Sequence, residues 1–449
     1  MIKRAVILIV GIAVVVAGRW FFFYNGSYSA PQTKTPGYEH ITAPTPSAAK
    51  FTDSARAGTG TVLIDEVHDN QFTVDELSVL VERVLSRGYE VEYLNIGEKG
   101  KVDREREAAL RARLSLADAF VVAVPRNPFT LPEIALVSDF VDKGGKLILV
   151  GDATRTGQIN TLAGQFGVTF QADYLYNQKD NDGNFRNIFL KEFKQSALTS
   201  GLQQVVLYSA SSITPTELGL AFTDANTFSN LIHSQERFSP ILISQNNRVL
   251  AISDLTLMGE PYNAAYDDNR FIANIADWLT QSERKFLLSD FPHFFRGKVK
   301  IELADPKFAD LGLKVRSALQ DYRKTGELGK LEGGGVFLGL FSNADNVSAE
   351  LRAGGISIAT EKETSVEIRG IGQAYRPETA LLYLYSDGKN RTLILLADVE
   401  SGLQRLVDGL AKGDFRQWLV RDDLALSYLK KPETPTPKPV EKPAATVKP

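Results

Sequence analysis

The sequence contains no cysteine among its 449 residues. This absence excludes disulfide bonds, thiolate metal sites and a cysteine nucleophile. Basic residues are not in excess either, since 51 Lys and Arg stand against 54 Asp and Glu, for a formal net charge of -3. A nucleic-acid binder needs a basic surface that neutralises phosphates. We therefore expect neither thiol chemistry nor a nucleic-acid partner.

Several motifs that carry known chemistry are also missing. The sequence has no P-loop, no G-x-G-x-x-G after an apolar run, no H-E-x-x-H, no EF-hand loop and no G-x-S-x-G. We therefore predict no cofactor and no resident metal. A hydrophobic share of 43% is enough for sizeable cores, and the length suits two or three ordinary domains.

One long apolar segment lies near the N-terminus. It runs from Ala5 to Tyr24 after two basic residues, and Arg19 is its only charge. Such a segment has about the length that crosses a bilayer. The leading positive charges predict a single-pass protein of the cell membrane, anchored in the lipid by residues 5–24, with a cytoplasmic N-terminus and an extracytoplasmic bulk. A cleaved signal peptide is the alternative, although Pro31 directly after the small residues disfavours cleavage there.

Composition divides the rest of the chain. Residues 25–58 are rich in Pro, Ser, Thr, Ala and Gly and predict a flexible stalk. Repeated prolines in residues 431–449 predict a disordered tail. Two globular domains are expected between these segments, at 59–282 and 283–430.

The first globular region alternates apolar runs with helical patterns. Thr73 and Thr130 each stand three residues before a glutamate, which is the capping-box pattern at a helix start. Unbroken apolar runs between helices predict an α/β fold with a parallel sheet covered on both faces. Strands are expected at 61–66, 89–94, 118–125, 146–151, 205–210, 240–244 and 248–254, and a closing helix at 267–279.

The second region has a different pattern. TALLYLY and RTLILLA are joined by a turn at 386–390, which predicts an antiparallel hairpin. Further strands are expected at 298–303 and 335–341, and a helix at 399–411. We predict a separate α+β domain. The aromatic stretch FLLSDFPHFFR (286–296) lies at the junction, and its rings are expected to pack between the two domains, with an exposed partner-binding patch as the alternative.

Three stretches of the first region carry a family resemblance: IDEVHDN after the first predicted strand, FVDKGGKLILVGD, and VLAISDLTLMGEPYNAAYDDNRFIANIADWL. The region resembles the class I glutamine-amidotransferase-like, flavodoxin-like domains of bacterial membrane proteins, and gliding-motility-type ABC-transporter accessory proteins carry related domains. The resemblance covers about half of the chain and implies a three-layer sheet fold. Amidotransferases of this fold use a cysteine on a sharp turn, which this chain lacks.

The most polar of these stretches is a candidate site. The polar residues at and just after the end of the first predicted strand, where ligands of parallel sheets bind, are Asp65, Glu66, His68, Asp69 and Asn70. They offer an acid/base pair or mixed metal ligands. The alternative is structural, because Asp and Asn form turns and buried polar groups close the end of a sheet.

Two further candidate sites follow later strands. Asp152 stands near the position of the nucleophile turn, with Thr154 and Arg155 after it. Asp254 ends another strand, and Asp268 and Asn269 begin the closing helix, where acids also cap free amides. The functional hypothesis is that these residues flank one rim and bind a ligand; the alternative is structural, a capped strand-to-helix turn at Asp152 and helix capping at Asp268 and Asn269.

The functional expectation is a membrane-anchored binding or scaffold protein with a catalytically inactive amidotransferase-like domain. It would be accessory to an envelope or ABC-transport complex and have a membrane or envelope protein as partner. The alternative is a hydrolase of envelope glycan or peptide that uses Asp65, His68 and Asp152.

Overall fold

The computed structural model describes residues 2–24, 51–55, 57–97, 102–232, 237–281, 284–295, 298–321, 324–358, 365–387 and 390–428. Most of the predicted stalk and the whole predicted tail lie outside the described residues. Segments 1–47 and 48–449 form separate compact units.

Helix α1 (Ile2–Tyr24) is the apolar N-terminal segment. Its part from Ile2 to Phe23 is long and apolar enough to cross a membrane. At about 1.5 Å per residue it spans roughly 33 Å, which matches a hydrocarbon core of about 30 Å. A signal sequence passes the same test, so the helix itself establishes the possibility of a membrane span and not the topology.

The first part of the large unit is built on an eight-stranded sheet in the order β2-β1-β3-β4-β14-β13-β11-β8. The first five strands run parallel and the last three antiparallel. The predicted parallel sheet is therefore present, with an antiparallel extension. The strands are β1 (Gly60–Asp65), β2 (Tyr89–Leu94), β3 (Ala119–Ala123), β4 (Lys146–Val150), β8 (Glu192–Phe193), β11 (Gly219–Phe222), β13 (Ile241–Ser244) and β14 (Val249–Ile252).

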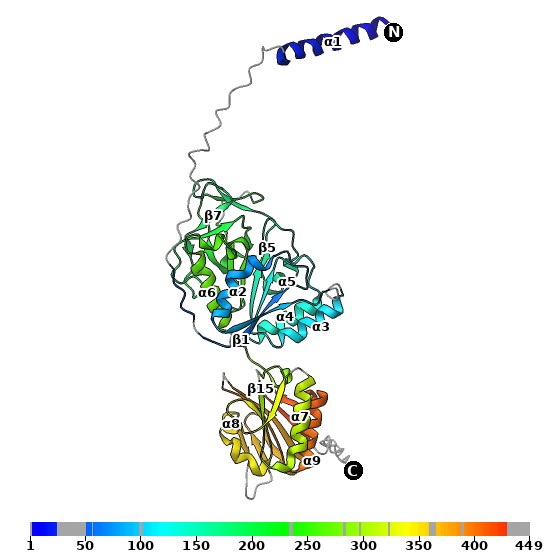
Figure 1. The fold of residues 1–449 in the computed structure, drawn as a ribbon, viewed down its shortest axis with the longest axis vertical. Coiled ribbons are helices and arrows are strands. Elements are labelled where there is room, and N and C mark those ends of the chain that lie inside the picture. Colours follow the sequence, from blue (N-terminus) through cyan, green and yellow to red (C-terminus); the bar gives the residue numbers. More distant parts are fainter. Residues whose placement is uncertain are drawn as a thin grey trace, which may run out of the picture. The chain divides into compact units, whose positions relative to one another are not determined.

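Helices cover both faces of this sheet (Figure 1). One face packs against α2 (Ser78–Ser86) and α6 (Asp268–Thr280). The other packs against α3 (Asp103–Leu114) and α4 (Leu131–Asp142), with short α5 (Asn160–Ala163). Side chains alternate between the two cores, with Val62 and Ile64 of β1 in the α2/α6 core and Leu63 in the α3/α4 core. Because of this alternation, polar residues at the ends of two strands can meet only if they point to the same face of the sheet.

The predicted strand at 205–210 is not part of this sheet. Strand β9 (Val205–Tyr208) pairs antiparallel with β7 (Asn187–Leu190) alone. Two more small antiparallel pairs stand beside the main sheet: β5 (Thr169–Phe170) with β10 (Ile213–Thr214), and β6 (Leu175–Asn177) with β12 (Thr227–Ser229). Local apolar pattern predicts a strand but not its partner, because partner choice depends on tertiary contacts.

The second part of the large unit has a seven-stranded sheet in the order β16-β15-β17-β22-β21-β24-β23. The predicted hairpin of β21 (Thr379–Ser386) and β22 (Arg391–Ala397) is confirmed. The predicted α+β arrangement of this region is not confirmed, because four neighbouring strands, β16, β15, β17 and β22, run parallel. The remaining strands are β15 (Lys298–Leu303), β16 (Thr325–Leu328), β17 (Gly335–Leu340), β23 (Leu419–Arg421) and β24 (Leu424–Tyr428).

Helices again cover both faces of this second sheet (Figure 1). The α7 (Ala309–Asp321) and α9 (Glu400–Lys412) helices pack on one face. The other face is covered by α8 (Ser348–Ala353) and by a small sheet of β18 (Ile356–Ile358), β19 (Ser365–Ile368) and β20 (Gly372–Tyr375).

The aromatic stretch at the junction is where the prediction of interdomain packing fails. Phe291, Phe294 and Phe295 are buried in the core beneath α7 and α9. Phe286 is partly buried against the same core. The three buried rings therefore belong to the interior of the second part. Phe286 stays at the junction, where Arg284 lies over both Phe286 and Phe140 of α4.

Candidate functional site

His68 is held in a closed cluster of charges at the end of β1. Its Nδ1 lies 2.9 Å from Asp65 Oδ2, and its Nε2 lies 3.6 Å from Glu133 Oε2 on α4. The ring stacks on Phe129 with centroids 3.6 Å apart. Asp65, His68 and Glu133 are all 0% exposed. No solvent or ligand reaches the imidazole in this arrangement.

His68 and Glu133 each shift the pKa of the other toward the charged form. Burial alone would lower the pKa of His68, but Asp65 and Glu133 outweigh burial and raise this pKa to about 9. Burial would raise the pKa of Glu133, but His68 and the Thr130 backbone and hydroxyl lower it to about 2. Arg106 of α3 adds a further contact, 3.1 Å from Nε to Glu133 Oε1. At neutral pH His68 is therefore a buried imidazolium between two carboxylates.

The loops after β1 and β3 close the crevice in which a parallel sheet would take a ligand. The backbone amides of Arg126 and Asn127 donate to His68 O, at 3.0 and 2.9 Å. Asn70 Nδ2 donates to Ala123 O at 2.8 Å, and Arg126 pairs with Asp69 at 3.1 Å. Glu66 points elsewhere and accepts from Asn95 at 2.9 Å. Protein atoms occupy the place of a ligand here.

An open cavity lies at the same end of the sheet, next to β4. Its volume is about 300 Å³. The walls are the turn after β4, the start of α5 and the segment at 170–173; among the lining residues are Val124, Asp152, Thr154, Arg155, Thr156, Gln171 and Ser211. We call this cavity the rim cavity.

Asp152 and Asp173 are the buried carboxylates of the rim cavity, and Asp173 accepts hydrogen bonds from Ser212 and Ser229. Asp152 is less completely bonded. Its Oδ1 accepts from the Thr154 amide at 2.8 Å and from Thr154 Oγ1 at 2.5 Å. Its Oδ2 is buried and has no hydrogen-bond donor, with Arg155 Nε 3.7 Å away. Arg155 turns its guanidinium to Glu76 and to the Gln71 carbonyl. Asp152 thus presents one carboxylate oxygen whose hydrogen bonding is incomplete.

Backbone strain marks the same cavity. Val124, which follows β3 and lines the rim cavity, has φ of 41°. A β-branched residue rarely adopts a positive φ, and such strain of about 1–3 kcal/mol is found most often at binding and active sites. The amide of Gln71 donates to Val124 O at 3.0 Å and holds this conformation.

Asp254 and Asp268 anchor neighbouring loops. Asp254 accepts from the amides of Tyr208 at 2.6 Å and Thr256 at 2.9 Å. Burial raises the pKa of Asp254 to about 7, and nearby Asp152 adds to this. Asp268 accepts from the Val206 amide at 2.9 Å instead of capping its own helix, and burial raises its pKa well above the usual range. Both carboxylates hold β9 in place.

The candidate residues therefore divide into two groups on opposite faces of the sheet. Asp65 and His68 lie on the α3/α4 side, since Asp65 follows Leu63 in the alternation of β1. Asp152 continues the alternation of Ile148 and Val150, which face the α2/α6 core. No hydrogen bond or ion pair joins Asp152 to His68 in the part of the chain that the structure describes. The structure does not bring the three proposed hydrolase residues into one cleft.

The partners that complete both groups were not predicted from the sequence. Glu133 stands in a capping box, where its Oε2 accepts from the Thr130 amide at 2.8 Å. Helix capping alone explains a glutamate at this position of the sequence, so nothing indicated a second contact with His68. Glu76 likewise stands in the capping box of Thr73. Arg106 lies on α3 and resembles an ordinary surface charge in the sequence. The one available signal was that Glu133 follows the strand next to the IDEVHDN strand, at the same edge of the sheet.

Comparisons with known proteins find no shared family. No family model and no curated protein matches the chain. Among solved structures, the mmIFT52 N-terminal domain is 13% identical, with TM-score 0.41 over 50% of this chain and 100% of that one. A putative ThuA-like protein from Parabacteroides merdae is 10% identical (TM-score 0.31; 52% and 94%). The glutaminase domain of Trypanosoma brucei CTPS is 11% identical (TM-score 0.25; 50% and 98%). All three similarities are weak. One of the three structures, the glutaminase domain, has a glutamine-amidotransferase-like fold.

Proposed function

We propose that this chain is a membrane-anchored extracytoplasmic binding protein. Its first domain keeps a flavodoxin-like, amidotransferase-like architecture and has no catalysis of that class. The strand order β2-β1-β3-β4-β14 supports the flavodoxin-like assignment. We further propose an envelope or ABC-transport complex as the partner.

One observation carries this proposal: the only histidine of the candidate set is enclosed at 0% exposure between Asp65 and Glu133. A general base must reach a substrate proton within hydrogen-bond distance. The rim cavity, in contrast, is open and holds the incompletely bonded Asp152 and the strained Val124. This combination suits binding without proton transfer by a histidine.

The test blocks the rim cavity with one side chain. Thr156 is exposed and lines the rim cavity, so Thr156→Trp fills its mouth without replacing a buried group. Ala349 of α8 is exposed in the second domain, and Ala349→Trp is the matched control. Each tagged full-length variant is cross-linked in native membranes, solubilised in detergent and purified.

We expect wild type and Ala349→Trp to retain a stoichiometric membrane partner and Thr156→Trp to lose it. Recovery of the bare wild-type chain would contradict the binding proposal. Equal capture by Thr156→Trp would place the partner's contact away from the rim cavity.

A further inference from the structure

Strand β9 is held along one edge by carboxylates instead of by a neighbouring strand. Its other edge pairs with β7. The Val206 amide donates to Asp268 Oδ1 at 2.9 Å, and the Tyr208 amide donates to Asp254 Oδ2 at 2.6 Å. Amides two residues apart point to the same edge of a strand. The two carboxylates therefore occupy the place that another strand would take.

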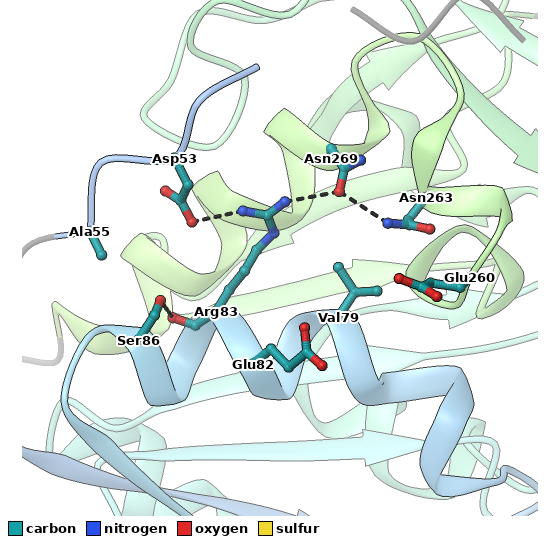
Figure 2. A pocket seen from close by; sticks show the side chains of 9 residues that line it. All are labelled: Asp53, Ala55, Val79, Glu82, Arg83, Ser86, Glu260, Asn263 and Asn269. Atoms are coloured by element: carbon teal, nitrogen blue, oxygen red, sulfur yellow. Dashed lines mark hydrogen bonds and ion pairs between the residues drawn. The ribbon is translucent and has the colours of Figure 1, made fainter. Parts of the chain in front are cut away.

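The two carboxylates belong to elements of the main sheet and its helices. Asp254 lies two residues after the end of β14, and Asp268 begins α6. The next residue, Asn269, accepts from Arg83 Nη2 of α2 at 2.8 Å and from Asn263 Nδ2 at 3.1 Å. Figure 2 shows these two hydrogen bonds as dashed lines. Because they tie the start of α6 to α2, losing the bonds to the carboxylates releases β9 and leaves α6 in place.

Both carboxylates are almost completely removed from water. Asp254 is 1% exposed and Asp268 is 0% exposed. The other oxygen of Asp254 accepts from the Thr256 amide at 2.9 Å, whereas Asp268 Oδ2 has no donor among the described residues. Burial favours the neutral form of a carboxyl group unless donors or a cation compensate the charge. Asp268 has neither on its second oxygen.

The surroundings of the pair add negative charge. Neither carboxylate forms an ion pair within the ranges that the structure describes, since Arg155 pairs with Glu76 and Arg270 lies 3.8 Å from Asp267. The charged and titratable groups that face the pair are Asp152 and Arg155 after β4, Asp267 before α6, and Tyr208 of β9.

These surroundings shift the ionisation of all three buried groups toward the neutral form. Burial raises the pKa of Asp254 to about 7, and Asp152 adds to this. Burial raises the pKa of Asp268 well above its usual range, and Asp254 and Asp267 add to this. Burial also raises the pKa of Tyr208, so the phenol stays neutral. The charge of the two carboxyl groups therefore changes near neutral pH and above.

Strand β9 leads directly into the wall of the rim cavity. Ser209 follows the strand with φ of 66°, and Ser211 lines the rim cavity. Ser253, the residue before Asp254, donates from Oγ to Ser211 O at 2.6 Å. The chain that the carboxylates hold is thus continuous with the candidate binding site.

We propose that Asp254 and Asp268 form a proton-dependent latch that holds β9, and with it the wall of the rim cavity, at mildly acidic pH and loosens both as the pair becomes fully ionised. This inference rests on the proposed function of the rim cavity. A protonated carboxyl group still accepts from the strand amide through its carbonyl oxygen. Full ionisation leaves two negative charges in the core beside Asp152, and opening exposes them to water. Because both folded pKa values lie above the usual 3.8, the held state binds more protons than the open state. Opening therefore increases as pH rises through about 7.

The test measures amide hydrogen exchange of the full chain in detergent at pH 5.5 and pH 8, corrected for the intrinsic pH dependence of exchange. Residues 203–211 report on β9, and β3 is the internal reference. Asp268→Asn keeps an acceptor for the Val206 amide and places an uncharged NH2 group where Oδ2 was.

Asp224→Asn is the matched control in the same domain. Burial would raise the pKa of Asp224, but hydrogen bonds from Asn226 and Thr227 lower it. This carboxylate is therefore ionised at both pH values, and its bonds go to Asn177, Asn226 and Thr227, none of them in β9.

Between pH 5.5 and pH 8, we expect the protection of β9 to fall at least about tenfold more than that of β3, in wild type and in Asp224→Asn. Most of this difference should be lost in Asp268→Asn. Equal pH dependence of β9 and β3 in wild type would overturn the latch, whether or not Asp268→Asn folds. An undiminished difference in folded Asp268→Asn would overturn it as well.

Partner capture at the two pH values separates the latch from the proposed function. We expect wild type to capture more partner at pH 5.5 than at pH 8, and equal capture would contradict the link to the rim cavity. A pH-dependent β9 without a partner at either pH would support the latch and contradict the proposed function. A captured partner with a pH-independent β9 would overturn the latch alone.

Discussion

At the residue scale, the properties of His68 come from its partners more than from its sequence neighbours. Three acids within the five residues from Asp65 to Asp69 suggest chemistry. Of these three, Asp65 reaches the ring, and the second carboxylate comes from α4. A buried imidazolium is tolerated because both ring nitrogens face carboxylates. The same groups that would activate a catalytic histidine therefore hold this one in the core.

Removing one of these carboxylates should lower the free energy of unfolding more than removing a similar carboxylate at the surface. Glu133→Gln keeps the shape and leaves buried His68 and Arg106 with less opposing charge, so we expect a loss of roughly 3 kcal/mol in unfolding free energy. Glu76→Gln alters the other capping box, whose glutamate is only partly buried, and serves as control. Denaturant unfolding of both variants gives the comparison; equal losses would contradict a special role of the buried cluster.

The cluster also predicts how stability depends on pH. The pKa of His68 rises from 6.5 to about 9 on folding, so protonation favours the folded state. This contribution is fully present below pH 6.5 and is lost as pH rises through about 9, on the order of 3 kcal/mol in all. His68→Gln should remove this part of the pH dependence. Urea midpoints of both proteins between pH 6 and 10 test it, and parallel curves would count against it.

At the element scale, strands buried on both faces were the most predictable part of the fold. The runs that became β1, β3, β4 and β14 are apolar on both faces, so position and type follow from composition alone. The pairing of β9 with β7 and the parallel strands of the second sheet were not predictable. They depend on contacts between segments far apart in the chain, which local periodicity does not encode.

The same dependence on tertiary contacts limited how much of the candidate sites could be predicted from the sequence. The polar ends of strands could be found from sequence, because each follows an apolar run. Which face of the sheet each side chain takes depends on where the strand ends, and a shift of one residue reverses it. Asp65 and Asp152 therefore seemed compatible with one rim and lie on different faces.

The parallel pairing in the second sheet makes one glycine indispensable. A Cβ on Gly335 of β17 would lie 2.4 Å from Lys300 O of β15, a backbone atom fixed by the ladder. Gly335→Ala should therefore destabilise the domain by about 1–3 kcal/mol, as overpacking does. Gly329→Ala, whose Cβ would come no closer than 3.9 Å to Lys300, is the control. Thermal unfolding distinguishes them, and an unchanged midpoint for Gly335→Ala would refute this packing.

At the scale of the whole molecule, the N-terminal helix α1 is long and apolar enough to cross a membrane. If α1 stays in place as an anchor, the full-length chain should remain in the membrane pellet after alkaline carbonate washing, and a C-terminal tag should be digested by protease added outside intact cells. Two basic residues before the apolar segment predict this orientation for an anchored chain. A shortened, soluble chain would indicate a cleaved signal sequence instead, and a protected tag would indicate the reverse orientation.

We propose that the first domain binds a partner and does not hydrolyse it. The most direct measurement incubates wild type and His68→Gln with purified envelope glycan and peptide, and follows both fragment release and partner capture. We predict no fragments above background from either protein, and equal partner capture once His68→Gln is shown to be folded. Fragments released by wild type and absent with folded His68→Gln would contradict the account and favour a hydrolase.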